Sequence, residues 1–395
     1  MQGNVERELR IGLAGIGSVS RQVLPELETA ANVKLTAVAD VRQEALDRCH
    51  ERYGCETYTS VDAMCASPNV DAIWICTPNM YHAEHAIIAA EHGKHVICEK
   101  PMAVTLEQAR EMVAAVERNG VRYVQGHSRI FDAPIRKMRE VVSSGELGRV
   151  IQINTWEFKP WLSGQPRLPS ELDYTIGGGV LYRQGPHQID IVRGIGGGMV
   201  KSLRAITGRW DPAFPDAEGD YTAFLEFEDG TAATMVFNGY GYFDIGELTF
   251  GLGEARHLVD GRPQQEHRTQ AANTEEKYAF AAARGEHEQQ RRAAGGPRNQ
   301  PFFGLTVVSC ERGDLRQSAQ GIYRYTEEGR DELAVDPRIH GRGELGELRD
   351  ALAEDRPTFP NQRWGQASLE VALAIRQSST ERREVPLSLQ VPVPF

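Results

Sequence analysis

The chain has 395 residues, of which 41% are apolar and 25% charged, and its formal net charge is −11. This length is enough for two domains with full cores, whereas the acidic balance argues against nucleic acid, which proteins bind mainly through clustered Lys and Arg. The sequence has no run of about 18 apolar residues that could span a membrane and begins with a polar stretch unlike a secretory signal, so we expect a cytoplasmic protein.

The first part of the chain alternates short apolar runs with helical patterns whose apolar residues recur every three or four positions. The apolar runs are Arg10–Ala14, Lys34–Ala39, Ala72–Cys76, His95–Cys98 and Arg122–Gln125. Short apolar strands separated by amphipathic helices indicate a parallel sheet covered on both faces. We therefore predict an α/β, Rossmann-type doubly wound domain over residues 1–127.

A glycine motif opens this domain. The first apolar run leads into Gly15-Ile16-Gly17, and the second ends just before Asp40. In a dinucleotide site the first glycine permits a tight turn, the second lets the backbone approach the pyrophosphate, and the acidic residue accepts hydrogen bonds from the ribose. Ser20 replaces the third glycine of the motif, so an ordinary glycine turn is the alternative. The expected cofactor contacts are Gly15, Gly17, Ser18, Val19, Asp40 and Arg42.

The acidic residue also bears on the choice of cofactor. We expect NAD in preference to NADP, because Asp40 would repel a 2′-phosphate and accept hydrogen bonds from a 2′-hydroxyl. Arg42 could offset this repulsion by binding the phosphate, which keeps NADP as the alternative cofactor.

A lysine directly follows the apolar run that ends at Cys98, in the sequence Glu99-Lys100-Pro101. In an open α/β sheet, ligands bind at the carboxyl ends of the strands. A lysine at that edge can hydrogen-bond a substrate hydroxyl or exchange a proton with it. The alternative is a surface lysine paired with Glu99.

After a helix expected at 131–144, longer strand-like runs replace the alternation. They are Val150–Phe158, Lys201–Trp210, Tyr221–Glu228, Thr231–Asn238 and Leu248–Leu252, with Asp229-Gly230 as a hairpin turn. We predict an α+β domain over residues 128–395 with a large open, mostly antiparallel sheet. Residues 261–300 form a charged insertion, either a helical arm or a solvated loop, and a last helix is expected at about 366–378.

Three glycines, Gly177 to Gly179, precede a stretch with helical spacing that contains Arg183, His187 and Asp190. On one helix these positions, four and seven residues apart, share a face. His187 titrates near neutral pH, as a general acid or base must. The alternative is a structural histidine that packs against or caps the helix.

The cysteines and histidines show no metal-binding pattern. The six cysteines form no C-x-x-C pair, and the eleven histidines show no ligand spacing such as H-E-x-x-H. We therefore expect buried thiols in a reducing compartment and no metal site.

Together these elements resemble the Gfo/Idh/MocA family of oxidoreductases. The resemblance rests on the glycine turn, Thr77-Pro78-Asn79-Met80-Tyr81-His82, Gly93-Lys94-His95-Val96, Glu99-Lys100-Pro101, the Gly177–Asp190 stretch and Arg363-Trp364-Gly365. It implies hydride transfer with NAD(P), a proton-handling pair formed by Lys100 and His187, and a homodimer or homotetramer built on the open sheet. The cofactor contacts that it adds are Thr77, Pro78, Asn79, His82, Glu99 and Lys100.

One position departs from the family pattern. Most members carry an aspartate that supports the catalytic histidine where this chain has Arg183, so we expect an anionic substrate group beside His187. The segments Trp156–Asp173 and Tyr182–Asp190 look most like the branch that contains phthalate 4,5-cis-dihydrodiol dehydrogenases. The expected substrate contacts are Lys100, Arg129, Trp156, Lys159, Arg167, Tyr182, Arg183 and His187.

The resemblance leaves three hypotheses for the function. The first is an NAD(P)-dependent dehydrogenase that oxidises a cis-dihydrodiol carboxylate to a catechol. The second is a sugar, polyol or glycoside dehydrogenase, and the third is a non-catalytic nucleotide-binding sensor. The presence of both Lys100 and His187 argues against the sensor.

Overall fold

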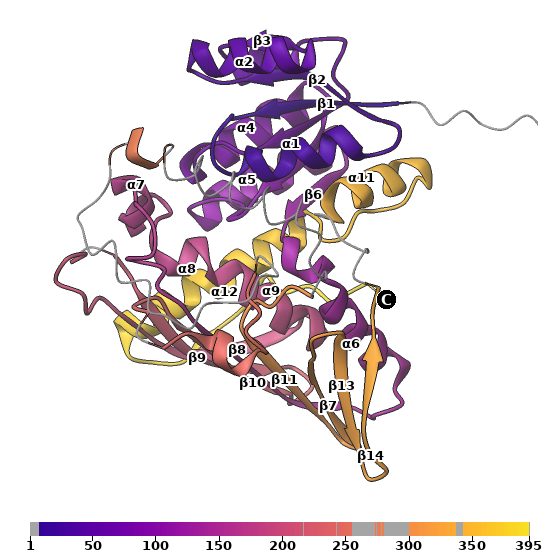
Figure 1. Cartoon of the computed structure of the whole chain (residues 1–395), viewed down its shortest axis with the longest axis vertical. Helices are drawn as coiled ribbons and strands as arrows, with labels where there is room; N and C mark the ends of the chain where they lie inside the picture. Colours follow the sequence, from indigo (N-terminus) through magenta and orange to yellow (C-terminus); the bar gives the residue numbers. More distant parts are fainter. Residues whose placement is uncertain are drawn as a thin grey trace, which may run out of the picture. The chain divides into compact units, whose positions relative to one another are not determined.

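The structure is a computed structural model that describes residues 8–215, 217–241, 243–254, 273, 275–277, 279, 300–336 and 343–394. The chain divides into two compact units (Figure 1). The first contains Met1–His127 and Gly341–Leu369, and the second contains Ser128–His340 and Glu370–Phe395. The first segment ends where the sequence predicts a domain boundary. Residues 341–369, expected in the second domain, belong instead to the first unit because their contacts lie there.

The first unit contains a six-stranded parallel sheet with the order β3-β2-β1-β4-β5-β6. Its strands are β1 Leu9–Ala14, β2 Val33–Ala39, β3 Glu56–Tyr58, β4 Ala72–Ile75, β5 His95–Glu99 and β6 Tyr123–Gly126. This order confirms the doubly wound fold. The short strand β3 lies at the edge and has no apolar run to predict it.

Helices follow the strands of the first unit, and their boundaries have local causes. They are α1 Ser20–Thr29, α2 Gln43–Tyr53, α3 Val61–Cys65, η1 Asn79–Tyr81, α4 His82–Glu91, α5 Leu106–Asn119 and α11 Gly343–Ala353. Thr105 and Gln108 form a capping box that starts α5, and Gly120 ends it with a φ of 62°. Leu345 and Leu348 of α11 belong to the apolar core of this unit, which explains why this late segment groups with it.

The second unit contains a nine-stranded sheet with the order β14-β13-β12-β11-β7-β10-β9-β8-β15. Its strands are β7 Val150–Phe158, β8 Val200–Gly208, β9 Asp220–Phe227, β10 Ala232–Asn238, β11 Leu305–Cys310, β12 Gly313–Gln317, β13 Gly321–Thr326, β14 Gly329–Ala334 and β15 Val385–Pro386. Strands β7 and β10 pair in parallel, and the remaining pairs are antiparallel. The mostly antiparallel sheet is therefore confirmed.

Two local expectations in this sheet have different outcomes. The hairpin turn is confirmed: Gly230 has a φ of 85° between β9 and β10. The strand expected at Leu248–Leu252 is wrong. Asp244 accepts a hydrogen bond from the Gly246 N–H and starts the 3-10 helix η4 Ile245–Leu248 instead. Such side-chain bonds to nearby backbone compete with strand formation.

Helices lie along one face of the large sheet. The helical segments are η2 Ser128–Phe131, α6 Ala133–Ser144, α7 Pro169–Leu172, η3 Tyr174–Ile176, α8 Gly179–Arg183, α9 Gly185–Ile195 and α12 Gln362–Glu381, the last of which crosses the division between the units. Helix α6 contacts β12 and β13, and α9 contacts β7 and β10. The helices expected at 131–144 and 366–378 correspond to α6 and α12.

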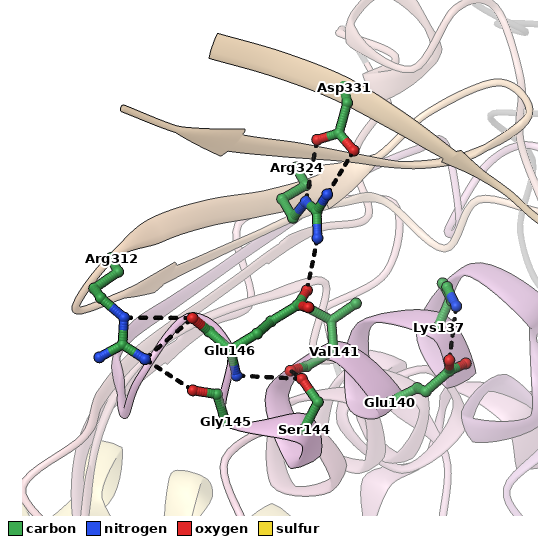
Figure 2. Close-up of polar contacts among 9 residues, drawn as sticks. All are labelled: Lys137, Glu140, Val141, Ser144, Gly145, Glu146, Arg312, Arg324 and Asp331. Carbon is green, nitrogen blue, oxygen red and sulfur yellow. Dashed lines mark hydrogen bonds and ion pairs between the residues drawn. The ribbon is translucent and has the colours of Figure 1, made fainter. Parts of the chain in front are cut away.

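The carboxyl end of α6 is tied to the outer strands of the sheet (Figure 2). Arg312 donates to the carbonyl oxygens of Gly145 and Glu146, and Arg324 bridges the carboxylates of Glu146 and Asp331. The Arg324 contacts measure 2.9 Å to Glu146 and 2.8 Å to Asp331.

The structure describes little of the charged insertion for which the sequence predicts an arm or a loop. Most of the charged insertion at 261–300 lies outside the described residues. Within the described part of the chain, no helix is long and apolar enough to cross a membrane, and no cluster of His, Cys, Asp or Glu could hold a metal ion. All six cysteines are buried, as expected.

Candidate functional site

The turn from β1 into α1 suits a dinucleotide. Gly15 has a φ of 91°, and a Cβ there would come within 2.8 Å of the Cys76 carbonyl oxygen. A Cβ on Gly17 would meet nothing within 4 Å, so open space lies over this residue. Ser20 donates to the Gly17 carbonyl oxygen at 2.7 Å and thereby closes the turn where the motif usually has glycine. Ser18 and Val19 are half-buried beside it.

Asp40 lies at the expected end of β2 and is held by donors of the protein. Its carboxylate accepts hydrogen bonds from the Ile16 N–H at 2.7 Å and from the Arg42 N–H at 2.9 Å, and the Arg42 guanidinium also pairs with it. Burial alone would raise the pKa of Asp40, but the Arg42 side chain and the two backbone donors lower it overall. The carboxylate is therefore an ionised acceptor, and Arg42 lies beside it.

The segment with Lys100 is joined to the Thr77-Pro78-Asn79 turn by a buried histidine. His82 is 1% exposed. Its Nδ1 lies 2.7 Å from the Pro101 carbonyl oxygen and its Nε2 lies 2.8 Å from that of Thr77. The ring thus connects two segments that the sequence assigns to the cofactor. This position makes His82 a structural link between the two segments, and its direct contact with the cofactor stays a prediction.

The end of β5 is fixed from the neighbouring strand. Gln125 of β6 donates to the carbonyl oxygens of Cys98 and Glu99 at 3.1 and 3.3 Å. Glu99 is buried, Lys100 is half-buried, and the Lys100–Pro101 peptide is cis. Lys100 therefore emerges from a rigidly held strand end.

In the second unit, the stretch after Gly177-Gly178-Gly179 is not one continuous helix. Helix α8 ends at Arg183, α9 begins at Gly185, and Gln184 between them has a φ of −122°. Pro186 explains the break, because proline is favoured in the first turn of a helix and disfavoured within one. The expectation that Arg183 and His187 share one helical face is therefore wrong.

Arg183 makes an ion pair within the protein. It lies 2.7 Å from Oε1 of Glu171, whose other oxygen contacts Lys277. Burial alone would raise the pKa of Glu171, but Arg183, Lys277 and Arg167 lower it to about 2. The carboxylate beside Arg183 is thus one of the chain's own.

His187 instead lies against Phe303, and two expected substrate contacts approach the same ring. The ring centroids of His187 and Phe303 are 5.0 Å apart. Lys159 Nζ lies 4.5 Å and Arg129 Cζ 5.7 Å from the centre of the Phe303 ring. His187 is 7% exposed. Three predicted residues from η2, α9 and the end of β7 therefore meet around one aromatic side chain.

Gln188 positions the start of α9 on the sheet. Its side chain donates to Thr155 of β7 and to the Val236 carbonyl oxygen of β10, and it accepts a hydrogen bond from Tyr221. Because Gln188 follows His187 directly, these bonds also fix the place of His187.

The other expected substrate contacts lie elsewhere in this unit. Trp156 points to the open face of the sheet and is 39% exposed, since neighbouring strand residues face opposite sides. Tyr182 is buried under the guanidinium of Arg376, whose Cζ lies 4.8 Å from the ring centre. Arg167 is buried and donates to the Trp161 carbonyl oxygen.

Sequence reasoning missed the acidic residues of this site. Glu157 is 3% exposed. Burial raises its pKa to about 7, against the effect of Lys159 and with that of Glu254. Glu254 contacts both Arg129 and Lys159. The alternation in β7 held a signal for Glu157, because it shares the covered face with Ile153 and Thr155. Glu254 and Phe303 are distant in sequence and had none.

Comparison with known proteins defines the class. Residues 9–127 match the family described as "Oxidoreductase family, NAD-binding Rossmann fold", and residues 135–244 match "GFO/IDH/MocA C-terminal domain". With the open glycine turn, these matches make the chain an NAD(P)-dependent oxidoreductase with an NAD-binding first unit.

The similarity to individual relatives extends over almost the whole chain. It is 32% identical over 377 residues to the 1-carboxy-3-chloro-3,4-dihydroxycyclohexa-1,5-diene dehydrogenase of Comamonas testosteroni, covering 93% of this chain and 94% of that one. The chain is also 34% identical in sequence to a protein from Bordetella bronchiseptica RB50 whose crystal structure is known. The two structures match with a TM-score of 0.82 over 96% of this chain and 100% of that one. The chain belongs to the Gfo/Idh/MocA family.

A sugar-related enzyme also matches, over a shorter part. The chain is 30% identical over 239 residues to the D-glucoside 3-dehydrogenase of Escherichia coli K12, covering 56% of this chain and 68% of that one. Relatives of this family thus act on chemically different substrates.

Proposed function

We propose that this oxidoreductase oxidises a cis-dihydrodiol that carries a ring carboxylate and yields the catechol. The observation that carries the proposal is the meeting of Arg129, Lys159 and His187 around Phe303. Two cations beside a candidate acid or base suit a substrate in which a carboxylate lies on the reacting ring. The relative from Comamonas testosteroni, whose name describes a carboxylated dihydroxycyclohexadiene, supports this substrate class.

In the proposed reaction, bound NAD supplies the hydride acceptor. His187, aided by Lys100, accepts the proton of the hydroxyl group on the carbon that loses the hydride, so that carbon becomes a carbonyl. The neighbouring ring carbon then loses its proton while the carbonyl oxygen gains one. The product is an aromatic catechol, and this last step is strongly favourable.

The anion-binding role expected of Arg183 moves to Arg129 and Lys159 in this proposal. Arg183 is paired with the buried Glu171, which lies among several cations, and so is committed to the protein's own carboxylate. Arg129 and Lys159 have the place beside His187 that was expected of Arg183.

A sugar, polyol or glycoside dehydrogenase is the second candidate, and the partial match to D-glucoside 3-dehydrogenase supports it. We place it second because that match covers 56% of this chain, against 93% for the relative from Comamonas testosteroni. The sensor hypothesis is not supported, because the relatives named above are dehydrogenases.

A spectrophotometric screen tests the proposal. NAD and NADP are incubated with carboxylated cis-dihydrodiols, neutral cis-dihydrodiols, inositols and glucosides, and the absorbance of the reduced cofactor is followed at about 340 nm. We expect turnover of the carboxylated diols. Faster turnover of a sugar than of every carboxylated diol would overturn the substrate assignment.

A matched pair of lysine variants sharpens this test. Lys159→Met should raise KM for a carboxylated diol by about 30-fold or more, since a buried charge-assisted contact contributes roughly 2–4 kcal/mol. A neutral diol should be affected much less. Lys137→Met is the control, because Lys137 pairs with Glu140 within α6 (Figure 2).

The open face of the large sheet supports a homodimer or homotetramer. Three apolar side chains on it are between 39% and 49% exposed: Trp156, Ile206 and Phe224. Strand register places Trp156, Val236, Thr222 and Ile206 in one row across the sheet. A contiguous exposed apolar surface of this kind is typical of a protein interface.

A further inference from the structure

Two cations of the proposed substrate site share one acidic partner. Arg129 Nη2 donates to Oε2 of Glu254 at 3.1 Å, and Lys159 donates to Oε1 of the same carboxylate. Arg129 comes from η2 and Lys159 follows β7, whereas Glu254 lies in the segment after η4. One carboxylate thus bridges both cations, and this is the contact that the proposed function assigns to a carboxylate of the substrate.

Arg129 has a second carboxylate partner besides Glu254. Arg129 also pairs with Asp132 at 3.4 Å, so two cations face the carboxylates of Asp132 and Glu254. The side chains of Arg129 and Lys159 are only 16% and 20% exposed. If Glu254 left the bridge, both cations would lose a carboxylate partner in this partly buried place, which is costly. An anion that takes over the bridge removes that cost.

Two buried atoms beside the bridge offer further contacts. Arg129 Nε and Glu157 Oε2 find no hydrogen-bond partner among the described residues. Buried polar atoms in proteins are nearly always hydrogen-bonded, so such atoms are candidates for contacts with a ligand. Burial raises the pKa of Glu157, opposed by Lys159 and supported by Glu254, so the protonated carboxyl can donate to an incoming carboxylate.

We propose that the Glu254 carboxylate holds the place of the substrate carboxylate and is exchanged for it when the substrate binds. The inference rests on the proposed function, because it takes Arg129 and Lys159 as the anion subsite. The exchange selects for charge: a carboxylate can replace Glu254 on both cations, whereas a neutral hydroxyl would leave them uncompensated. It also keeps the two cations paired before the substrate arrives.

If the Glu254 carboxylate competes for the anion subsite, it lowers the apparent affinity of that subsite for an added carboxylate. This effect can be measured. The probe is benzoate, titrated calorimetrically into the full-length protein saturated with NADH. If Glu254 occupies the subsite about nine-tenths of the time, Glu254→Gln should tighten benzoate binding about tenfold. Glu254→Asp keeps the charge but shortens the side chain by one methylene, so it bridges the cations poorly and should also tighten binding.

Further variants separate exchange from a simple effect of net charge. Asp132→Asn also removes one negative charge beside Arg129, but it leaves the Glu254 carboxylate in its place on Arg129 and Lys159, so benzoate binding should change little. Two results would overturn the inference: Glu254→Gln binding benzoate no more tightly than the wild type, or Asp132→Asn matching Glu254→Gln while Glu254→Asp matches the wild type. Thermal denaturation of each variant shows whether it is folded.

Failure of the proposed function gives a different result. Lys159→Met should abolish benzoate binding in both the wild-type and Glu254→Gln backgrounds, and benzamide, the neutral analogue, should not respond to Glu254→Gln. If Lys159→Met binds benzoate normally, Lys159 is not part of an anion subsite, and the carboxylate recognition in the proposed function fails together with the inference. If benzoate responds as expected but only sugars are oxidised, the anion subsite stands and the proposed reaction is wrong.

Discussion

At the scale of single residues, the catalytic assignment depends on Lys100 and His187. Lys100→Ala or His187→Ala should lower kcat by about 100-fold or more, the usual effect of removing a positioned acid or base. Lys100 emerges from a strand end fixed by Gln125, and His187 from a helix start fixed by Gln188. NADH binding, followed by protein fluorescence, should change little in the His187 variant. A His187→Ala enzyme with nearly normal kcat would remove this histidine from the mechanism.

Asp40 and Arg42 carry the prediction on cofactor choice. We expect a higher kcat/KM with NAD than with NADP, because the ionised Asp40 carboxylate repels a 2′-phosphate. Asp40→Ser should remove this repulsion and release the Arg42 guanidinium from its pair with Asp40. The preference should then shift toward NADP by about tenfold or more, since a hydrogen bond between charged groups contributes roughly 1.5–3 kcal/mol. The double variant with Arg42→Ala is the control and should lose most of that gain. An unchanged cofactor preference in Asp40→Ser would contradict the assignment.

At the scale of elements, the turn between β1 and α1 separates two roles of glycine. Gly15→Ala would place a Cβ 2.8 Å from the Cys76 carbonyl oxygen at a φ of 91°, so it should lower the melting temperature of the cofactor-free protein. Gly17→Ala meets nothing within 4 Å, so the melting temperature should stay the same. The same variant should weaken NADH binding if the pyrophosphate passes over Gly17. Unchanged NADH affinity in Gly17→Ala would place the phosphates elsewhere.

The contact between α7 and α8 predicts a dependence of stability on pH. The pKa of Glu171 is about 2 in the folded chain, against a value of 4.5 for an unperturbed glutamate. The ionised Glu171 carboxylate stabilises the fold at pH values above its pKa in the unfolded chain. This contribution to stability is lost as the pH falls toward its pKa in the folded chain. The full contribution of the lowered pKa to the unfolding free energy is about 3 kcal/mol. The difference in unfolding free energy between wild type and Glu171→Gln should therefore narrow as the pH falls from about 5 toward about 2. A constant difference would show that the ion pairs do not stabilise the fold.

The predicted and observed elements also show where a sequence pattern is enough to predict a strand or helix. Strand β7 was predicted at its observed bounds because alternation along Val150–Phe158 marks a strand with one buried face. The break between α8 and α9 was not predicted, although Gly185-Pro186 gave a signal for a new helix start. Strand β3 lacks a strong apolar run, so pairing with its neighbour, rather than local pattern, determines it. Strand β11 was missed although its sequence, LTVVSC, is apolar and its burial alternates.

The candidate site could be predicted only in part, for a reason that concerns the whole chain. Lys100 and His187 lie in motifs with local spacing, so the sequence alone is enough to propose them as site residues. Phe303 and Glu254 approach Arg129 and Lys159 from distant parts of the sequence, and only tertiary structure brings these groups together. The same limitation made Arg183 look like a free anion-binding residue, because its partner Glu171 lies twelve positions earlier in another helix.

The whole molecule is expected to assemble through the open face of the large sheet. Trp156 and Phe224 are 39% and 49% exposed on this face, and burying such side chains against a second copy contributes about 25 cal/mol for each Å² removed from water. The double variant Trp156→Glu/Phe224→Glu should therefore shift the protein toward monomer in size-exclusion chromatography with light scattering. Leu248→Glu is the matched control, because Leu248 is also 49% exposed but lies in η4, outside the sheet. A wild-type protein that is monomeric at micromolar concentration, or a double variant that keeps the wild-type mass, would show that this face is not the interface.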